Sequence, residues 1–141
     1  MYPAPFSALS VYKTKAFARF AKRARISDAH LWKAAEFANR GSVDADLGGG
    51  VLKLRLARPG EGKSGGFRTI LVLRSEDIAV YLYGYEKKDR ANIDSRELQV
   101  LRRLAEAILG YNETQIAKRV EDGDFIKIPK PEEENAQKIP H

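Results

Sequence analysis

The sequence contains no cysteine among its 141 residues. Without thiols the chain cannot form disulfide bonds, cysteine-ligated zinc sites or thiolate nucleophiles, so disulfide scaffolds, zinc fingers and cysteine hydrolases are excluded. The absence of cysteine suits a reducing compartment. We therefore expect a protein of the cytoplasm.

Histidine is almost as scarce, because His30 and the terminal His141 are the two that occur. His30 falls within a predicted helix, so neither a histidine metal centre nor a Ser-His-Asp triad is expected. No segment approaches the ~20 apolar residues that cross a bilayer, and the first ten residues lack the basic and apolar regions of a signal peptide. These absences predict a soluble, cytoplasmic protein without a membrane partner.

The chain is basic, and its charge is unevenly distributed. It has 25 Lys and Arg against 19 Asp and Glu, a net charge of +6 and a pI near 9.6. Residues 13–25 contain six basic residues and no acidic one, whereas residues 121–141 contain six acids and three lysines. Residues 1–120 therefore hold 22 basic and 13 acidic residues, a net charge of +9. A basic body of this kind indicates a polyanionic partner such as a nucleic acid.

Two short helices are predicted in the N-terminal third. Apolar residues recur at helical spacing within residues 13–25, among basic residues that would face water. A second helix begins with Ser27 or Asp28 as its N-cap and ends near residues 39–41, where glycine favours a C-cap. The two helices would form a hairpin.

After three consecutive glycines, at residues 48–50, the hydrophobic period changes from 3.6 to 2. This change predicts strands over residues 52–57, 67–74 and 78–85, paired as an antiparallel meander. Alternation along the last strand places Tyr81, Tyr83 and Tyr85 on one face.

The C-terminal part is predicted to return to helix. Asp94 and Glu97 have the spacing of a capping box, so a third helix begins there and ends at Gly110. A short helix over residues 114–120 and an edge strand over 125–128 follow. The order ααβββα predicts an α+β fold, with one layer of helices on an antiparallel sheet. We expect an N-terminal extension (1–12), one domain (13–128) and a disordered acidic tail (129–141).

Basic and aromatic residues converge on the predicted sheet. Lys53 and Arg55 lie on the same face of the first strand, roughly 7 Å apart, and Arg68 begins the second strand. Arg and Lys hold phosphates, and tyrosine rings can stack on unpaired bases. The cluster therefore suits RNA, with these residues as candidate contacts: Lys63, Tyr83, Tyr85, Lys87 and Arg90.

The same residues could cleave RNA without a metal. Cleavage needs a base for the 2′-OH proton, positive charge for the phosphorane and an acid for the departing 5′-oxygen. Lysine is a poor base at neutral pH, but neighbouring cations disfavour its protonated form. We therefore expect Lys53 to act as the base, and Arg55 and Arg68 to stabilise the developing charge.

The sequence resembles the RelE/ParE superfamily of toxin-antitoxin toxins, and within it the RelE-type proteins that include HigB relatives. The resemblance extends over roughly residues 13–128. Its most specific part is the combination of a Gly-Gly-Phe-Arg segment with a later Tyr, Lys and Arg segment. The matching segments are residues 52–56 (LKLRL), 63–70 (KSGGFRTI), 83–93 (YGYEKKDRANI) and 116–128 with its Asp-Gly-Asp turn.

This resemblance implies a ribosome-dependent mRNA endoribonuclease that needs no cofactor and forms a complex with its antitoxin. By position, Lys53, Arg55 and Arg68 match basic residues of the family, and Lys88 falls near a basic residue that can act as the acid. The tyrosine that some RelE toxins carry just beyond this stretch is absent here. Tyr83 or Tyr85 is the candidate to replace it.

Other interpretations remain open at this point. A ParE-like member of the same fold would inhibit DNA gyrase by binding it, and an inactive member would bind RNA without cutting it. The basic cluster favours the nuclease over the gyrase inhibitor. The basic helix over residues 13–25 is a candidate docking site for an acidic or amphipathic antitoxin, and the acidic tail is a candidate internal brake.

Overall fold

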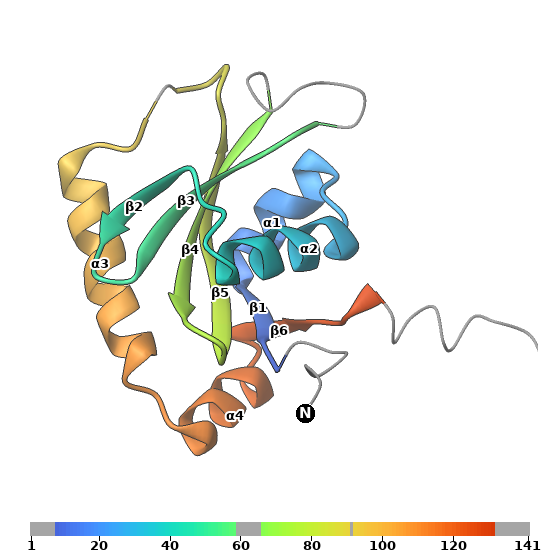
Figure 1. Cartoon of the computed structure of the whole chain (residues 1–141), viewed down its shortest axis with the longest axis vertical. Coiled ribbons are helices and arrows are strands. Elements are labelled where there is room, and N and C mark those ends of the chain that lie inside the picture. The colour runs from blue at the N-terminus through green and yellow to red at the C-terminus, as the bar shows by residue number, and fades with distance from the viewer. Residues whose placement is uncertain (1–7, 59–65, 91, 132–141) are drawn as a thin grey trace, which may run out of the picture.

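The computed structural model describes residues 8–58, 66–90 and 92–131. Their strands form one six-stranded sheet in the order β2-β3-β4-β5-β1-β6 (Figure 1). The elements in chain order are β1 (Ser10–Thr14), α1 (Lys15–Ala24), α2 (Asp28–Asn39), β2 (Ala45–Gly48), β3 (Val51–Leu56), β4 (Phe67–Arg74), β5 (Ile78–Glu86), α3 (Ser95–Leu109), α4 (Glu113–Glu121) and β6 (Phe125–Ile128).

Local sequence signals located most of these elements. Ser27 caps α2, with its hydroxyl accepting from the His30 N–H at 3.1 Å. Asp94 and Glu97 form the expected capping box of α3. The meander of β3, β4 and β5 is antiparallel throughout, and β6 is an edge strand, as predicted.

The sheet is mixed rather than wholly antiparallel, because of a strand that the sequence pattern did not reveal. β1 pairs in parallel with β5 and antiparallel with β6. Three of its residues fall in the segment expected to be an extension, yet Val11 and Tyr12 are buried. A five-residue strand has too few residues for a clear alternation, and its partners lie more than 60 residues away. The four-residue β2 was missed for the same reason of length.

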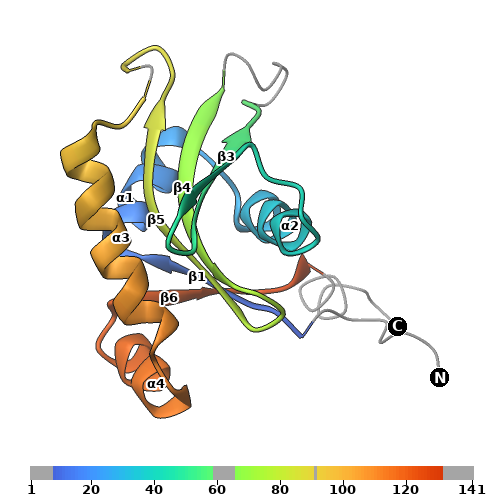
Figure 2. The same ribbon diagram turned by 60° about the vertical axis from the view of Figure 1, so that its left-hand side comes forward.

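Helices cover both faces of the sheet, which corrects the expectation of one helical layer (Figure 2). α1 and α2 pack on one face, and α3 and α4 on the other. The six residues from Phe67 to Val72 in β4 are all buried, which is the pattern of a strand covered on both sides.

A β-bulge in β5 separates the three tyrosines that were expected to share one face. Ile70 pairs with Tyr83, but the next residue, Leu71, pairs with Tyr81, so β5 has one extra residue here. Tyr81 consequently packs on the side of α1 and α2, where its hydroxyl donates to the Leu31 carbonyl at 2.7 Å. Tyr83 lies on the opposite side, against α3.

Candidate functional site

Basic residues of adjacent strands occupy neighbouring register positions, and strand alternation assigns them to the face of the sheet that α3 covers. Arg55 of β3 pairs with Arg68 of β4, and Arg68 pairs in turn with Tyr85 of β5. One step along, Lys53 pairs with Ile70, and Ile70 with Tyr83. We call this group, together with a residue from the segment before α3, the sheet site: Lys53, Arg55, Arg68, Tyr83, Tyr85 and Arg90.

Arg68 is the most enclosed cation of the sheet site, with 5 % of its surface exposed. Arg55 lies directly opposite it, and like charges in that position oppose one another. Arg55 itself is exposed, and its Nε lies 3.9 Å from an Asp44 carboxylate oxygen. Two cations thus lie at one register position of neighbouring strands, an arrangement that attracts anions.

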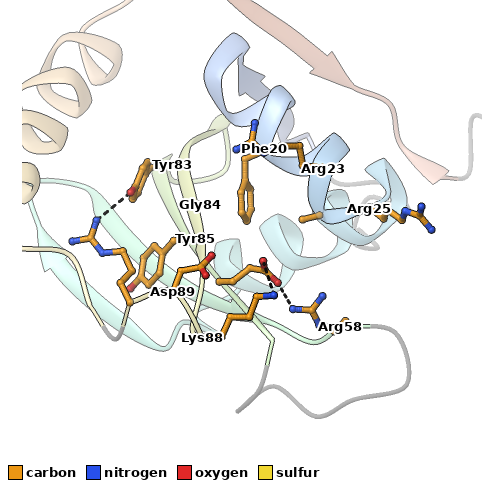
Figure 3. A pocket seen from close by; sticks show the side chains of 12 residues that line it. Phe20, Arg23, Arg25, Arg58, Tyr83, Gly84, Tyr85, Lys88 and Asp89 are labelled. Carbon is orange, nitrogen blue, oxygen red and sulfur yellow. Dashed lines mark hydrogen bonds and ion pairs between the residues drawn. The ribbon is translucent and has the colours of Figure 1, made fainter.

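Arg90 lies in the segment before α3 and borders the sheet site on that side. Its guanidinium donates to both Glu97 carboxylate oxygens, at 2.8 and 2.5 Å, and to the Tyr83 hydroxyl at 3.2 Å. It also lies over the Tyr85 ring, 5.6 Å from the centroid. Figure 3 shows Tyr83 and Tyr85 side by side, with the hydrogen bond to Tyr83 dashed. Arg90 thereby ties α3 to the end of β5.

Glu97 stabilises this arrangement, because its carboxylate accepts hydrogen bonds from both Arg90 and the N-terminal cap of α3. Its Oε1 also accepts from the Asp94 backbone N–H at 3.1 Å. The hydrogen bonds from Arg90, and then that from Asp94, lower the pKa of Glu97 to about 2. The same carboxylate raises the pKa of Arg90, which stays charged.

Replacing Glu97 by Gln is expected to make the free energy of unfolding depend less on pH in the acid range. The folded-state pKa lies below its ordinary value of 4.5, so the ionised carboxylate stabilises the protein above that pH and loses this effect as pH falls towards 2. Gln keeps the capping geometry but does not titrate. Urea unfolding of wild type and Glu97→Gln between pH 2 and 5 measures this. Parallel curves over that range would contradict the assignment.

A cavity of about 490 Å³ opens at the end of β5 beyond its pairing with β1. It lies between α1 and the turn over residues 87–89 (Figure 3). Phe20 points at Gly84, where a Cβ atom would lie 2.3 Å from the ring, so glycine is required for this close approach. Both cations and rings line the cavity, including Arg58, Tyr83, Tyr85, Lys88 and Arg90.

The family model for the RelE toxin of RelE/RelB toxin-antitoxin systems matches residues 9–128. The chain belongs to the RelE toxin family. Members of this family are toxins that pair with an antitoxin and are generally mRNA endoribonucleases. The match runs from the residue before β1 to the end of β6, so it includes the whole sheet. The comparison with curated proteins gave no match.

The structure brings together only some of the residues that the RelE resemblance singled out. Lys53, Arg55 and Arg68 share one face, as expected from the sequence. Lys88 does not join them: its Nζ lies 3.9 Å from a Glu86 carboxylate oxygen, and Arg58 binds the same carboxylate. The hydrogen bond from Arg58 lowers the pKa of Glu86. Lys88 therefore lies on the α1 side of β5, where it lines the cavity.

Two of the predicted RNA contacts of this RelE-family chain remain to be placed. Lys87 is exposed in the turn after β5, and Lys63 lies outside the described residues. Sequence reasoning missed Phe20 and Arg58, and it recognised Glu97 only as a cap. Arg58 lies over the Phe67 ring, 4.7 Å from its centroid, and no local pattern marks that contact.

Within the described ranges, no three His, Asp or Glu side chains are grouped so that they could hold a metal ion. None of the helices in that same part of the chain has the length and apolar character needed to cross a membrane.

Proposed function

We propose that this RelE-family toxin cleaves mRNA on the ribosome by metal-independent attack of a 2′-OH on the adjacent phosphate. The observation that carries the proposal is the row Arg55, Arg68 and Tyr85 across three neighbouring strands, with Lys53 one step away. Converging cations on a rigid sheet supply the charge stabilisation that a phosphorane needs. Family membership supports the toxin role and the choice of RNA.

In the proposed reaction the 2′-oxygen forms a bond to phosphorus as Lys53 takes its proton. Arg55 and Arg68 hold the non-bridging oxygens, where negative charge develops. The bond from phosphorus to the 5′-oxygen breaks, leaving a 2′,3′-cyclic phosphate on one product. Lys88, whose side chain is 71 % exposed in the turn on the α1 side of β5, leaves Glu86 and crosses the end of β5 to protonate the 5′-oxygen.

The proposed partners are the ribosome, its mRNA and a cognate antitoxin. Lys63, Lys87 and Arg90 would contact RNA phosphates around the sheet site. The antitoxin would dock on α1, whose exposed side includes Lys15, Arg19, Lys22 and Arg23. No acidic residue occurs in this helix, so an acidic antitoxin segment would meet a uniformly positive surface.

Cleavage of a defined mRNA in a purified translation system tests the proposal. We expect cuts that require ribosomes, persist in EDTA and leave cyclic phosphate ends. Lys118→Ala, which removes an exposed cation from α4, is the matched control and should cleave like wild type. Cutting of free RNA would remove ribosome dependence from the proposal. If folded protein cuts nothing, a DNA gyrase supercoiling assay would distinguish a gyrase inhibitor from an inactive RNA-binding module.

A further inference from the structure

The Tyr85 hydroxyl is buried and makes no hydrogen bond in the part of the chain that the structure describes. The other two tyrosines of β5 differ from it. Tyr81 donates to the Leu31 carbonyl, and Tyr83 accepts from Arg90. Buried hydroxyls nearly always have a partner, because leaving one unpaired costs free energy. An unpaired hydroxyl in a functional site therefore points to a role in binding a ligand.

The ring of Tyr85 is not available for base stacking. Only 5 % of the residue is exposed, the Tyr83 ring lies 5.9 Å away, and the Arg90 guanidinium lies over the ring. The functional end of this side chain is consequently its hydroxyl. This differs from the stacking role that the sequence suggested.

Three charged side chains act on the Tyr85 hydroxyl: Arg68, Arg90 and Glu97. Arg68 pairs with Tyr85 across the strands. The charges of Arg68 and Arg90 act to lower the pKa of Tyr85, whereas Tyr83 and Glu97 act to raise it. Burial nevertheless raises the pKa of Tyr85, so the hydroxyl keeps its proton at neutral pH. Guanidinium groups have hydrogen-bond donors and no acceptor, so neither Arg68 nor Arg90 can accept a hydrogen bond from the Tyr85 hydroxyl. A phosphate has several acceptor oxygens, so one oxygen can accept from the Tyr85 hydroxyl while another binds the neighbouring Arg68.

We infer that the Tyr85 hydroxyl donates a hydrogen bond to a non-bridging oxygen of the RNA phosphate that is cleaved, beside Arg68. This inference rests on the proposed function and makes Tyr85 a further catalytic residue. The phosphate reaches the hydroxyl when Arg90 moves from the ring. Arg90 is a partly exposed side chain, and the 490 Å³ cavity that it lines gives it room to move.

Tyr85→Phe tests the inference, because it removes one oxygen that has no hydrogen-bond partner among the described residues. We expect cleavage to slow by about 10–100-fold, as for loss of one donor to a developing oxyanion. The Tm should stay the same or rise, since no hydrogen bond of the protein is lost. A decrease in kcat with little change in KM is expected, because the contact strengthens in the transition state.

Tyr81→Phe is the matched control, since Tyr81 uses its hydroxyl to bind α2 on the other face. Its Tm should fall by about 3–5 °C, while the cleavage rate per folded molecule stays unchanged. Full cleavage by Tyr85→Phe would overturn the inference. A Tm loss in Tyr85→Phe as large as that in Tyr81→Phe would also overturn it, because the hydroxyl would then have a structural partner.

Measuring the Tm with inorganic phosphate distinguishes failure of this inference from failure of the proposed function. Phosphate should raise the Tm of wild type, raise that of Tyr85→Phe less, and leave that of Arg68→Ala unchanged. If wild type cuts no RNA but phosphate shows this ranking, the cleavage proposal fails and the Tyr85 contact stands. If phosphate stabilises wild type and Tyr85→Phe equally, the contact is refuted whatever the cleavage result.

Discussion

Arg68→Ala is expected to reduce mRNA cleavage by about 10²–10³-fold, the cost of removing one preorganised donor from a developing oxyanion. Arg68 is the enclosed cation at the centre of the sheet site, between Arg55 and Tyr85 on the neighbouring strands. β4 is buried on both faces, so its backbone cannot shift to bring another cation into this position. Cleavage rates in the purified translation system measure the effect.

Arg68→Lys refines the same prediction. Lysine keeps the charge but loses the planar fork that binds two phosphate oxygens, so we expect a loss of about ten-fold, smaller than that for alanine. Circular dichroism must show that both variants fold. Wild-type toxicity in a folded Arg68→Ala protein would refute the assignment of this residue to the catalytic site.

Phe17→Ala is expected to lower the free energy of unfolding by about 3–4 kcal/mol, a large share of the stability of a domain this size. Phe17 is 1 % exposed, and its ring stacks on Tyr81 at 4.9 Å and contacts Phe20 at 5.6 Å. These contacts hold α1 against β5 beside Gly84. Truncation would leave a cavity between helix and sheet that rigid neighbours cannot fill.

Urea unfolding at neutral pH measures this effect, with Phe37→Ala as the control. Phe37 is 53 % exposed on α2, so the same chemical change there should cost about 1 kcal/mol or less. Equal losses in the two variants would contradict the importance of the packing between α1 and β5.

The sequence alone predicted the features that depend on neighbouring residues. The caps at Ser27 and Asp94 follow from side chains that bond to backbone three residues on. The location of β4 follows from its dense β-branched and apolar residues, and the shared face of Lys53 and Arg55 from the two-residue period of a strand. Each of these signals is complete within a short segment.

Tertiary structure decided the features that depend on distant residues. The parallel pairing of β1 with β5 joins segments more than 60 residues apart. The bulge in β5 reverses the alternation after Tyr81, and so moves Tyr83 and Tyr85 to the face of Arg68. Strand period alone cannot predict a bulge, because the extra residue is defined by its partner strand.

The candidate site likewise depends on both neighbouring and distant residues. The sequence predicted which cations and tyrosines belong to the site, but not which groups they bind. Lys88 meets Glu86 on the α1 side, Arg90 binds Glu97 of α3, and the Tyr85 hydroxyl has no hydrogen-bond partner within the described residues. These outcomes depend on side-chain directions and on the distance between packed elements. Such quantities exist only once the helices and the sheet have come together.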